Sequence, residues 1–126
     1  MKRQNKIASL VICITIILLL YNCKKNNPIA EFSVDNWMAV EQNQRYHMLE
    51  DLYVEVELVG MSSNEVEELL GKYSISHEAY LSDEGQCDYH WGYMVRYDSW
   101  EGDEYLLISF KDNIVVSYEL EYGSEL

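Results

Sequence analysis

The stretch that decides the fold is residues 88–121, which read DYHWGYMVRYDSWEGDEYLLISFKDNIVVSYELE. Apolar and polar side chains alternate here in three runs, 88–97, 105–111 and 114–121. This period of two is typical of β-strands that are buried on one face. Asp112-Asn113 is a two-residue turn signal between the last two runs, and the polar segment 98–103 joins the first two. The pattern predicts a three-stranded antiparallel meander.

Two helical patterns precede these strands. From Trp37 to about Leu58 apolar residues recur at helical spacing, although 54–58 alternates, so that the end of this segment is either helical or extended. Ser62 and Glu65 have the spacing of a capping box, and Gly71 stands where a helix C-cap glycine is expected. This second pattern predicts a helix of about nine residues.

The remaining segment, 73–86, contains a candidate short strand around Ala79-Tyr80-Leu81. The elements together predict an α+β fold in which two short helices pack on one face of a three- to four-stranded antiparallel sheet. The expected divisions are a signal peptide at 1–22, a tether at 23–33 and the α+β domain at 34–126.

The N-terminal segment has the features of a secretory signal. Lys2, Arg3 and Lys6 are followed by an almost unbroken apolar run, 7–20, which is shorter than the roughly 20 residues that a membrane-spanning helix needs. Leu20-Tyr21-Asn22-Cys23 resembles the lipobox of bacterial lipoproteins, in which the cysteine becomes the lipidated first residue. We therefore expect lipidation at Cys23. The alternatives are an uncleaved anchor, or an incidental cysteine after an ordinary signal peptide.

The charge of the chain limits its partners. The sequence has 22 Asp and Glu against 9 Lys and Arg, a formal net charge of −13, and removal of 1–22 would make it still more acidic. Such a surface repels phosphate backbones and anionic headgroups, which argues against nucleic-acid binding and leaves membrane attachment to the lipid on Cys23. Because Lys24 and not Asp follows Cys23, the resemblance favours the outer membrane, if the source has one. The domain is expected on its periplasmic face.

Few residues of the sequence are candidates for a metal site or a catalytic site. Cys87 would be the one cysteine left in the domain, so no internal disulfide is expected. Cys87 and His90 have Cys-x-x-His spacing near His77, but no second tight ligand pair is present, and a strand at 88–97 would point Cys87 away from His90. No nucleophile motif or phosphate-binding loop is recognisable. We expect no metal, no cofactor and no enzymatic activity.

The sequence is rich in aromatic residues, and these say more about function than the candidate metal ligands do. The chain has 11 Tyr and 3 Trp, and all but Tyr21 lie in the predicted domain or its tether. Either they seal a small core, or a second protomer covers them, or they form a protein-binding surface. The residues predicted to contact a partner are Trp91, Tyr93, Tyr97, Trp100 and Tyr105, with Asp98, Glu101 and Asp103 favouring a basic partner. The oligomeric state is left open.

Two spaced motifs carry a family resemblance. At Arg45-x-x-Met48-x-x-Asp51-Leu52 and Leu58-x-Gly60-Met61-Ser62-x-x-Glu65-Val66-x-x-Leu69-Leu70-Gly71 the chain resembles the SmpA/OmlA (BamE-like) small lipoproteins. The resemblance implies a non-catalytic binding or scaffolding module of the cell envelope, similar to outer-membrane assembly lipoproteins. Secreted β-lactamase-inhibitor-like proteins use the same fold in tandem. The alternative function is therefore an inhibitor-like protein that inserts the 98–103 loop into an enzyme.

Overall fold

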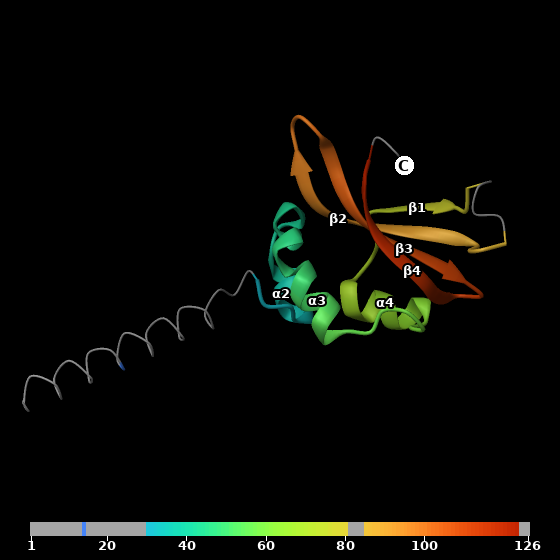
Figure 1. Cartoon of the computed structure of the whole chain (residues 1–126), viewed down its shortest axis with the longest axis horizontal. Helices are drawn as coiled ribbons and strands as arrows, with labels where there is room; N and C mark the ends of the chain where they lie inside the picture. The colour runs from blue at the N-terminus through green and yellow to red at the C-terminus, as the bar shows by residue number, and fades with distance from the viewer. Residues whose placement is uncertain (1–13, 15–29, 81–84, 124–126) are drawn as a thin grey trace, which may run out of the picture.

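A four-stranded antiparallel sheet forms the centre of the computed structural model, which describes residues 14, 30–80 and 85–123. The strands lie in the order β1-β2-β3-β4 and comprise β1 (Ile75–Glu78), β2 (Tyr89–Asp98), β3 (Gly102–Lys111) and β4 (Ile114–Tyr122). The helical segments are α2 (Val34–Ala39), the 3-10 helix η1 (Gln42–Met48), α3 (Leu49–Glu55) and α4 (Ser63–Leu70). They lie on one side of the sheet (Figure 1), which confirms the α+β class.

The first predicted helix is wrong as a single element, because it consists of α2, η1 and α3. The backbone is extended at Val40 (φ −79°, ψ 156°) and again at Val56. The segment 54–58 is therefore helical through Glu55 and leaves the helix at Val56, so each alternative holds for part of it. One continuous helix would separate Trp37 from Leu49 by roughly 18 Å along its axis. The break brings both side chains into the same core cluster. Tertiary burial therefore overrides the local helical pattern.

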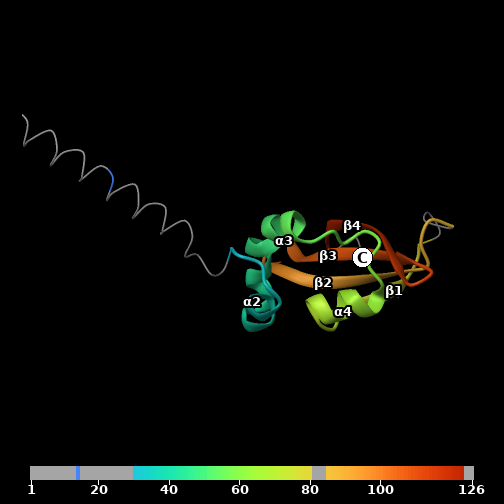
Figure 2. The same cartoon turned by 90° about the horizontal axis from the view of Figure 1, so that it is seen from below.

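Trp37 joins the helical segments together. Its side chain is fully buried, and its indole N–H donates to the carbonyl oxygen of Leu70 at the end of α4 (3.0 Å). The Arg45 guanidinium lies 4.7 Å from the centre of the Trp37 ring, and Arg45 Nε donates to the Trp37 carbonyl oxygen (3.2 Å). In the view of Figure 2, α2 and α3 lie toward one end of the sheet and α4 lies alongside its middle.

The second predicted helix is confirmed, with eight residues instead of about nine. Ser62 Oγ accepts a hydrogen bond from the Glu65 N–H (3.2 Å), and the Glu65 carboxylate accepts one from the Ser62 N–H (2.8 Å). Gly71 ends the helix at φ +78°, a conformation that side-chain-bearing residues rarely adopt. A Cβ at Gly71 would also lie 2.8 Å from Met38 Cε. The positive φ favours glycine there, whereas the flexible end of the exposed Met38 side chain can move away from an added Cβ.

The meander forms as the alternation predicts. Asp112 and Asn113 both have positive φ (51° and 61°), as a tight hairpin turn requires, and Lys111 pairs with Ile114 across it. The fourth strand was predicted four residues too late, because β1 covers 75–78 and not 79–81. Ala79 continues the pairing through one further hydrogen bond to the Asp88 carbonyl oxygen (3.1 Å). Leu81 lies outside the described residues.

The predicted tether ends earlier than residue 33. Phe32 packs edge-on against Trp37 (ring centroids 6.0 Å apart), and its N–H donates to the Asp51 carboxylate (2.6 Å). The last two tether residues therefore belong to the domain. The predictions for 1–22 and for Cys23 fall on residues that, Ile14 excepted, lie outside the described part of the chain. Within that part, no helix is long and apolar enough to cross a membrane.

Candidate functional site

The sheet has one face covered by helices and one open face. The pairs Trp91–Ile108 and Tyr93–Leu106 face the helices, because these residues belong to the core cluster or pack against it. Side chains alternate between the two faces of a sheet. The pair His90–Ser109 therefore lies on the open face. The described residues with side chains on this face include Ile75, His77, His90, Met94, Tyr97, Asp103, Tyr105, Leu107, Ser109, Ser117, Glu119 and Glu121.

Two of the predicted partner-binding residues are turned inward, so their prediction is wrong. Tyr93 is fully buried and donates its hydroxyl proton to the carbonyl oxygen of Gly71 (2.9 Å). Burial raises the pKa of the Tyr93 phenol, which keeps it a neutral donor. Trp91 is half-buried, with its ring 4.7 Å from both Tyr73 and Phe110. Both aromatic side chains seal the core under the helices.

Tyr97 and Trp100 are strongly exposed and lie at the tip of the β2–β3 hairpin. Their side chains are 62% and 94% exposed. The hairpin extends away from the helices, toward the top of Figure 1. An aromatic side chain of this size exposed on a turn has no role in the core.

Two acidic residues shape this tip. Asp98 Oδ1 accepts hydrogen bonds from the backbone N–H groups of Trp100 (2.7 Å) and Glu101 (3.2 Å). These bonds lower the pKa of the Asp98 carboxyl, since they stabilise its charged form. The Glu101 carboxylate accepts the hydroxyl proton of Tyr122 (3.3 Å). Asp98 and Glu101 therefore hold the turn in the conformation that presents Trp100.

The base of the hairpin is also anchored. Arg96 Nε and the Glu104 carboxylate form an ion pair at 2.9 Å across β2 and β3. The Arg96 guanidinium lies 5.3 Å from the centre of the Tyr46 ring in η1, and it donates to the Tyr122 hydroxyl (3.4 Å). The nearby Glu104 raises the pKa of Arg96. The hairpin thus connects to both the helical layer and β4.

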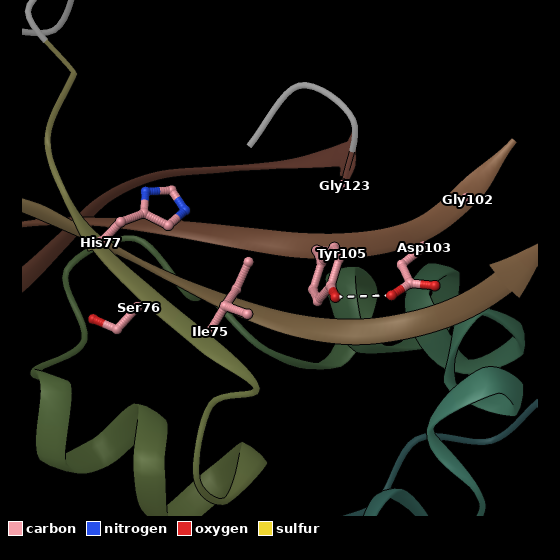
Figure 3. Close-up of a pocket in the computed structure, with 7 residues that line it drawn as sticks. All are labelled: Ile75, Ser76, His77, Gly102, Asp103, Tyr105 and Gly123. Atoms are coloured by element: carbon pink, nitrogen blue, oxygen red, sulfur yellow. Dashed lines mark hydrogen bonds between the residues drawn. The ribbon is translucent and has the colours of Figure 1, made fainter.

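The open face carries a pocket of about 620 Å³ (Figure 3). Tyr105 lies in this pocket and is only 8% exposed, so its predicted contact surface is limited to the part that lines the pocket. The Tyr105 hydroxyl donates to Asp103 Oδ2 (3.1 Å), and burial raises the pKa of the phenol. The described lining residues are Ile75, Ser76, His77, Gly102, Asp103, Tyr105 and Gly123.

A second group of polar side chains lies beside a cavity of about 300 Å³ on the same face. Cys87 Sγ lies 3.6 Å from His90 Nε2, and His90 Nδ1 lies 2.9 Å from Ser109 Oγ. The prediction that Cys87 points away from His90 is wrong, because Cys87 precedes β2 and does not follow its alternation. The His90–Ser109 pair was not predicted, since it depends on the register between β2 and β3.

This group does not form a metal site in the described part of the chain. No three His, Cys, Asp or Glu side chains there are placed to hold one metal ion. Both ring nitrogens of His90 already have protein partners, and Asp88 accepts a hydrogen bond from the Asp112 N–H (2.8 Å). The His77 and His90 rings lie near each other, with centroids 5.5 Å apart and planes tilted by 46°, but no hydrogen bond joins them.

Comparison with known proteins gave no match: no family model, no curated protein and no solved structure is similar to this chain. The SmpA/OmlA resemblance therefore stays a prediction from the quoted motifs.

Proposed function

We propose that this chain is a lipid-anchored, non-catalytic protein-interaction module of the bacterial cell envelope, and that it docks through the tip of the β2–β3 hairpin. The observation that carries the proposal is Trp100, which is 94% exposed on a turn held by hydrogen bonds. Tryptophan is enriched among the residues that dominate the binding energy of protein interfaces. A turn that is already ordered loses little entropy on binding.

The anchor and the location rest on the sequence. The basic residues, the apolar run and the cysteine at 2–23 are typical of a lipoprotein signal, and the acidic domain offers no basic patch for anionic lipids. Lipidation at Cys23 would hold the domain at a membrane surface. The proposed location is the periplasmic face of an outer membrane, if the source has one.

The inhibitor-like alternative uses the same loop in a different way. It requires an acidic residue of 98–103 to protrude into the active site of an enzyme. The Asp98 and Glu101 carboxylates are engaged within the protein. Asp103 lies in the pocket beside Tyr105, and the side chain that protrudes is Trp100. These contacts favour docking by an aromatic anchor over insertion of an acidic one.

Site-specific photocrosslinking in the source organism tests the proposal. A photoreactive phenylalanine analogue would replace Trp100 in the full chain, and in a matched control it would replace Val54, which is 77% exposed on α3. We expect a discrete adduct of one envelope protein from position 100 and none from position 54. Identical adduct patterns from both positions would reject docking through the hairpin tip.

The same cells test the anchor. Intact-protein mass spectrometry should find an acylated chain that begins at Cys23. An unmodified chain that retains Met1 would reject the lipid anchor.

A further inference from the structure

The pocket of Figure 3 has an apolar floor with a different polar group at each end. Ile75 and Tyr105 lie in its middle, His77 lies at one end and Asp103 at the other. Its volume of about 620 Å³ falls within the range of about 300–1,000 Å³ that is usual for ligand sites. The floor suits an apolar stem, so the two ends decide what binds.

The Asp103 end favours a cation. Among the described lining residues Asp103 is the one carboxylate, and the whole chain carries a net charge of −13. Asp103 Oδ2 accepts the Tyr105 hydroxyl proton, whereas Oδ1 has no partner among the described residues. A carboxylate beside an aromatic ring is the complement of a guanidinium group, which pairs with the carboxylate and stacks on the ring.

The His77 end lacks a hydrogen-bonding group. Both ring nitrogens of His77 are shielded from solvent, and neither has a hydrogen-bond partner among the residues that the structure describes. A buried polar atom without a partner destabilises a protein unless a ligand supplies one. The imidazole accepts through one nitrogen and donates through the other, so a peptide group satisfies either.

We infer that this pocket binds an arginine side chain of the protein partner. Its guanidinium pairs with Asp103, and its methylene stem lies on Ile75 and Tyr105. Its adjoining main-chain amide bonds His77 after the imidazole ring turns to present a nitrogen to the pocket. The inference rests on the proposed function, because the occupant is the partner that docks at Trp100. Gly102 and Asp103 follow directly on that turn, so a chain bound at the tip passes beside the pocket.

Titration of the full chain in detergent with N-acetyl-arginine-N-methylamide, followed by amide NMR, tests the inference. We expect saturable shifts at Ile75, His77, Tyr105 and Gly123. N-acetyl-citrulline-N-methylamide has nearly the same shape without the charge. It should bind at least about tenfold more weakly, since losing a hydrogen bond to a charged group corresponds to about a factor of ten or more in affinity. Equal affinity for the two compounds would overturn the inference.

Two variants and one control separate the pocket from general charge attraction. Asp103→Asn keeps the acceptor for Tyr105 and should weaken the arginine compound about tenfold. Glu50→Gln removes the same charge from an exposed position on α3 and should leave binding unchanged. His77→Phe keeps a ring beside Tyr80 and His90 and should weaken binding by a smaller factor. Equal losses in Asp103→Asn and Glu50→Gln would overturn the inference.

The outcome is distinguishable from that of the proposed function. If position 100 crosslinks to a partner but the arginine compound produces no localised shifts, the inference fails and the proposed docking stands. If the compound binds with the expected preference but position 100 gives no specific adduct, the arginine preference stands and docking through the hairpin fails.

Discussion

The two faces of the sheet differ in what covers them and in what their side chains do. On the helix-covered face, the paired residues of β2 and β3 are apolar or aromatic except for the Arg96–Glu104 ion pair. Leu106, Ile108 and Phe110 are fully buried there. On the open face, His90 pairs with Ser109, and the ring nitrogens of His77 have no hydrogen-bond partner within the described part of the chain. One face holds the domain together through apolar burial. The open face carries polar side chains, and polar groups of this kind would destabilise the protein if they lay unpaired in the core.

The open face also contains some packed apolar side chains. Leu107 is almost fully buried there, and Ile75 of β1 lies directly over Gly92 of β2. The two faces therefore differ in how much each contributes to stability. Substitutions on each face measure this difference.

The largest expected effect is on the covered face, at Trp37. Trp37→Ala removes a fully buried ring, its hydrogen bond to Leu70 and its contact with Arg45, so we expect a loss of about 3–5 kcal/mol in the free energy of unfolding. Urea denaturation followed by far-UV circular dichroism measures this loss. Trp100→Ala is the matched control and should change the free energy by no more than about 0.5 kcal/mol. Comparable losses of unfolding free energy in the two variants would show that Trp37 does not stabilise the protein more than the exposed Trp100.

A smaller effect is expected on the open face, at Gly92. A Cβ at this position would lie 2.5 Å from Ile75 Cγ1, so Gly92→Ala forces β1 away from β2 and should destabilise the domain by about 1–3 kcal/mol. Ile75→Ala removes the clashing atoms. The double variant should therefore lose clearly less than the sum of the two single losses. Additive losses, measured by the same denaturation, would show that the contact between Ile75 and Gly92 does not set the spacing of these strands.

Gly92 also illustrates what sequence patterns do and do not predict. The alternation of β2, the turn at Asp112-Asn113 and the capping box at Ser62 are local, and each was predicted correctly because its cause lies within a few residues. The position of β1 was predicted four residues late. Its place depends on Ile75 meeting Gly92, a contact between residues far apart in the chain.

The candidate site shows the same limit. Alternation predicts which residues share a face but not which face the helices cover. The sequence prediction that Trp91 and Tyr93 lie on the surface is therefore wrong, because both pack in or against the core. Tyr97 and Trp100 are exposed because they lie in or beside a turn, where no helix covers them. The pocket has no sequence signature, since it combines residues from β1, the start of β3 and the end of β4.

The smallest expected effect on global stability is at the tip of the β2–β3 hairpin. The expected change there is a local response of the turn to pH. The hydrogen bonds from the Trp100 and Glu101 N–H groups hold the pKa of Asp98 below its usual 3.8. Their stabilisation of the turn is therefore complete above pH 3.8 and is lost as the pH falls through the lowered pKa of the folded protein. We expect the amide resonances of Trp100 and Glu101 to shift in this acid range, while that of the buried Val66 stays in place.

Asp98→Asn separates the charge of Asp98 from the shape of the turn. The Asn side-chain oxygen can accept the same two hydrogen bonds but does not titrate. This variant should keep the amide positions of Trp100 and Glu101 and lose their acid response, whereas Asp98→Ala should disorder the turn at every pH. An acid response that persists in Asp98→Asn would mean that another group holds the tip. Trp100 would then owe its presentation to the base of the hairpin, where Arg96 contacts Glu104 and Tyr46, and not to the turn itself.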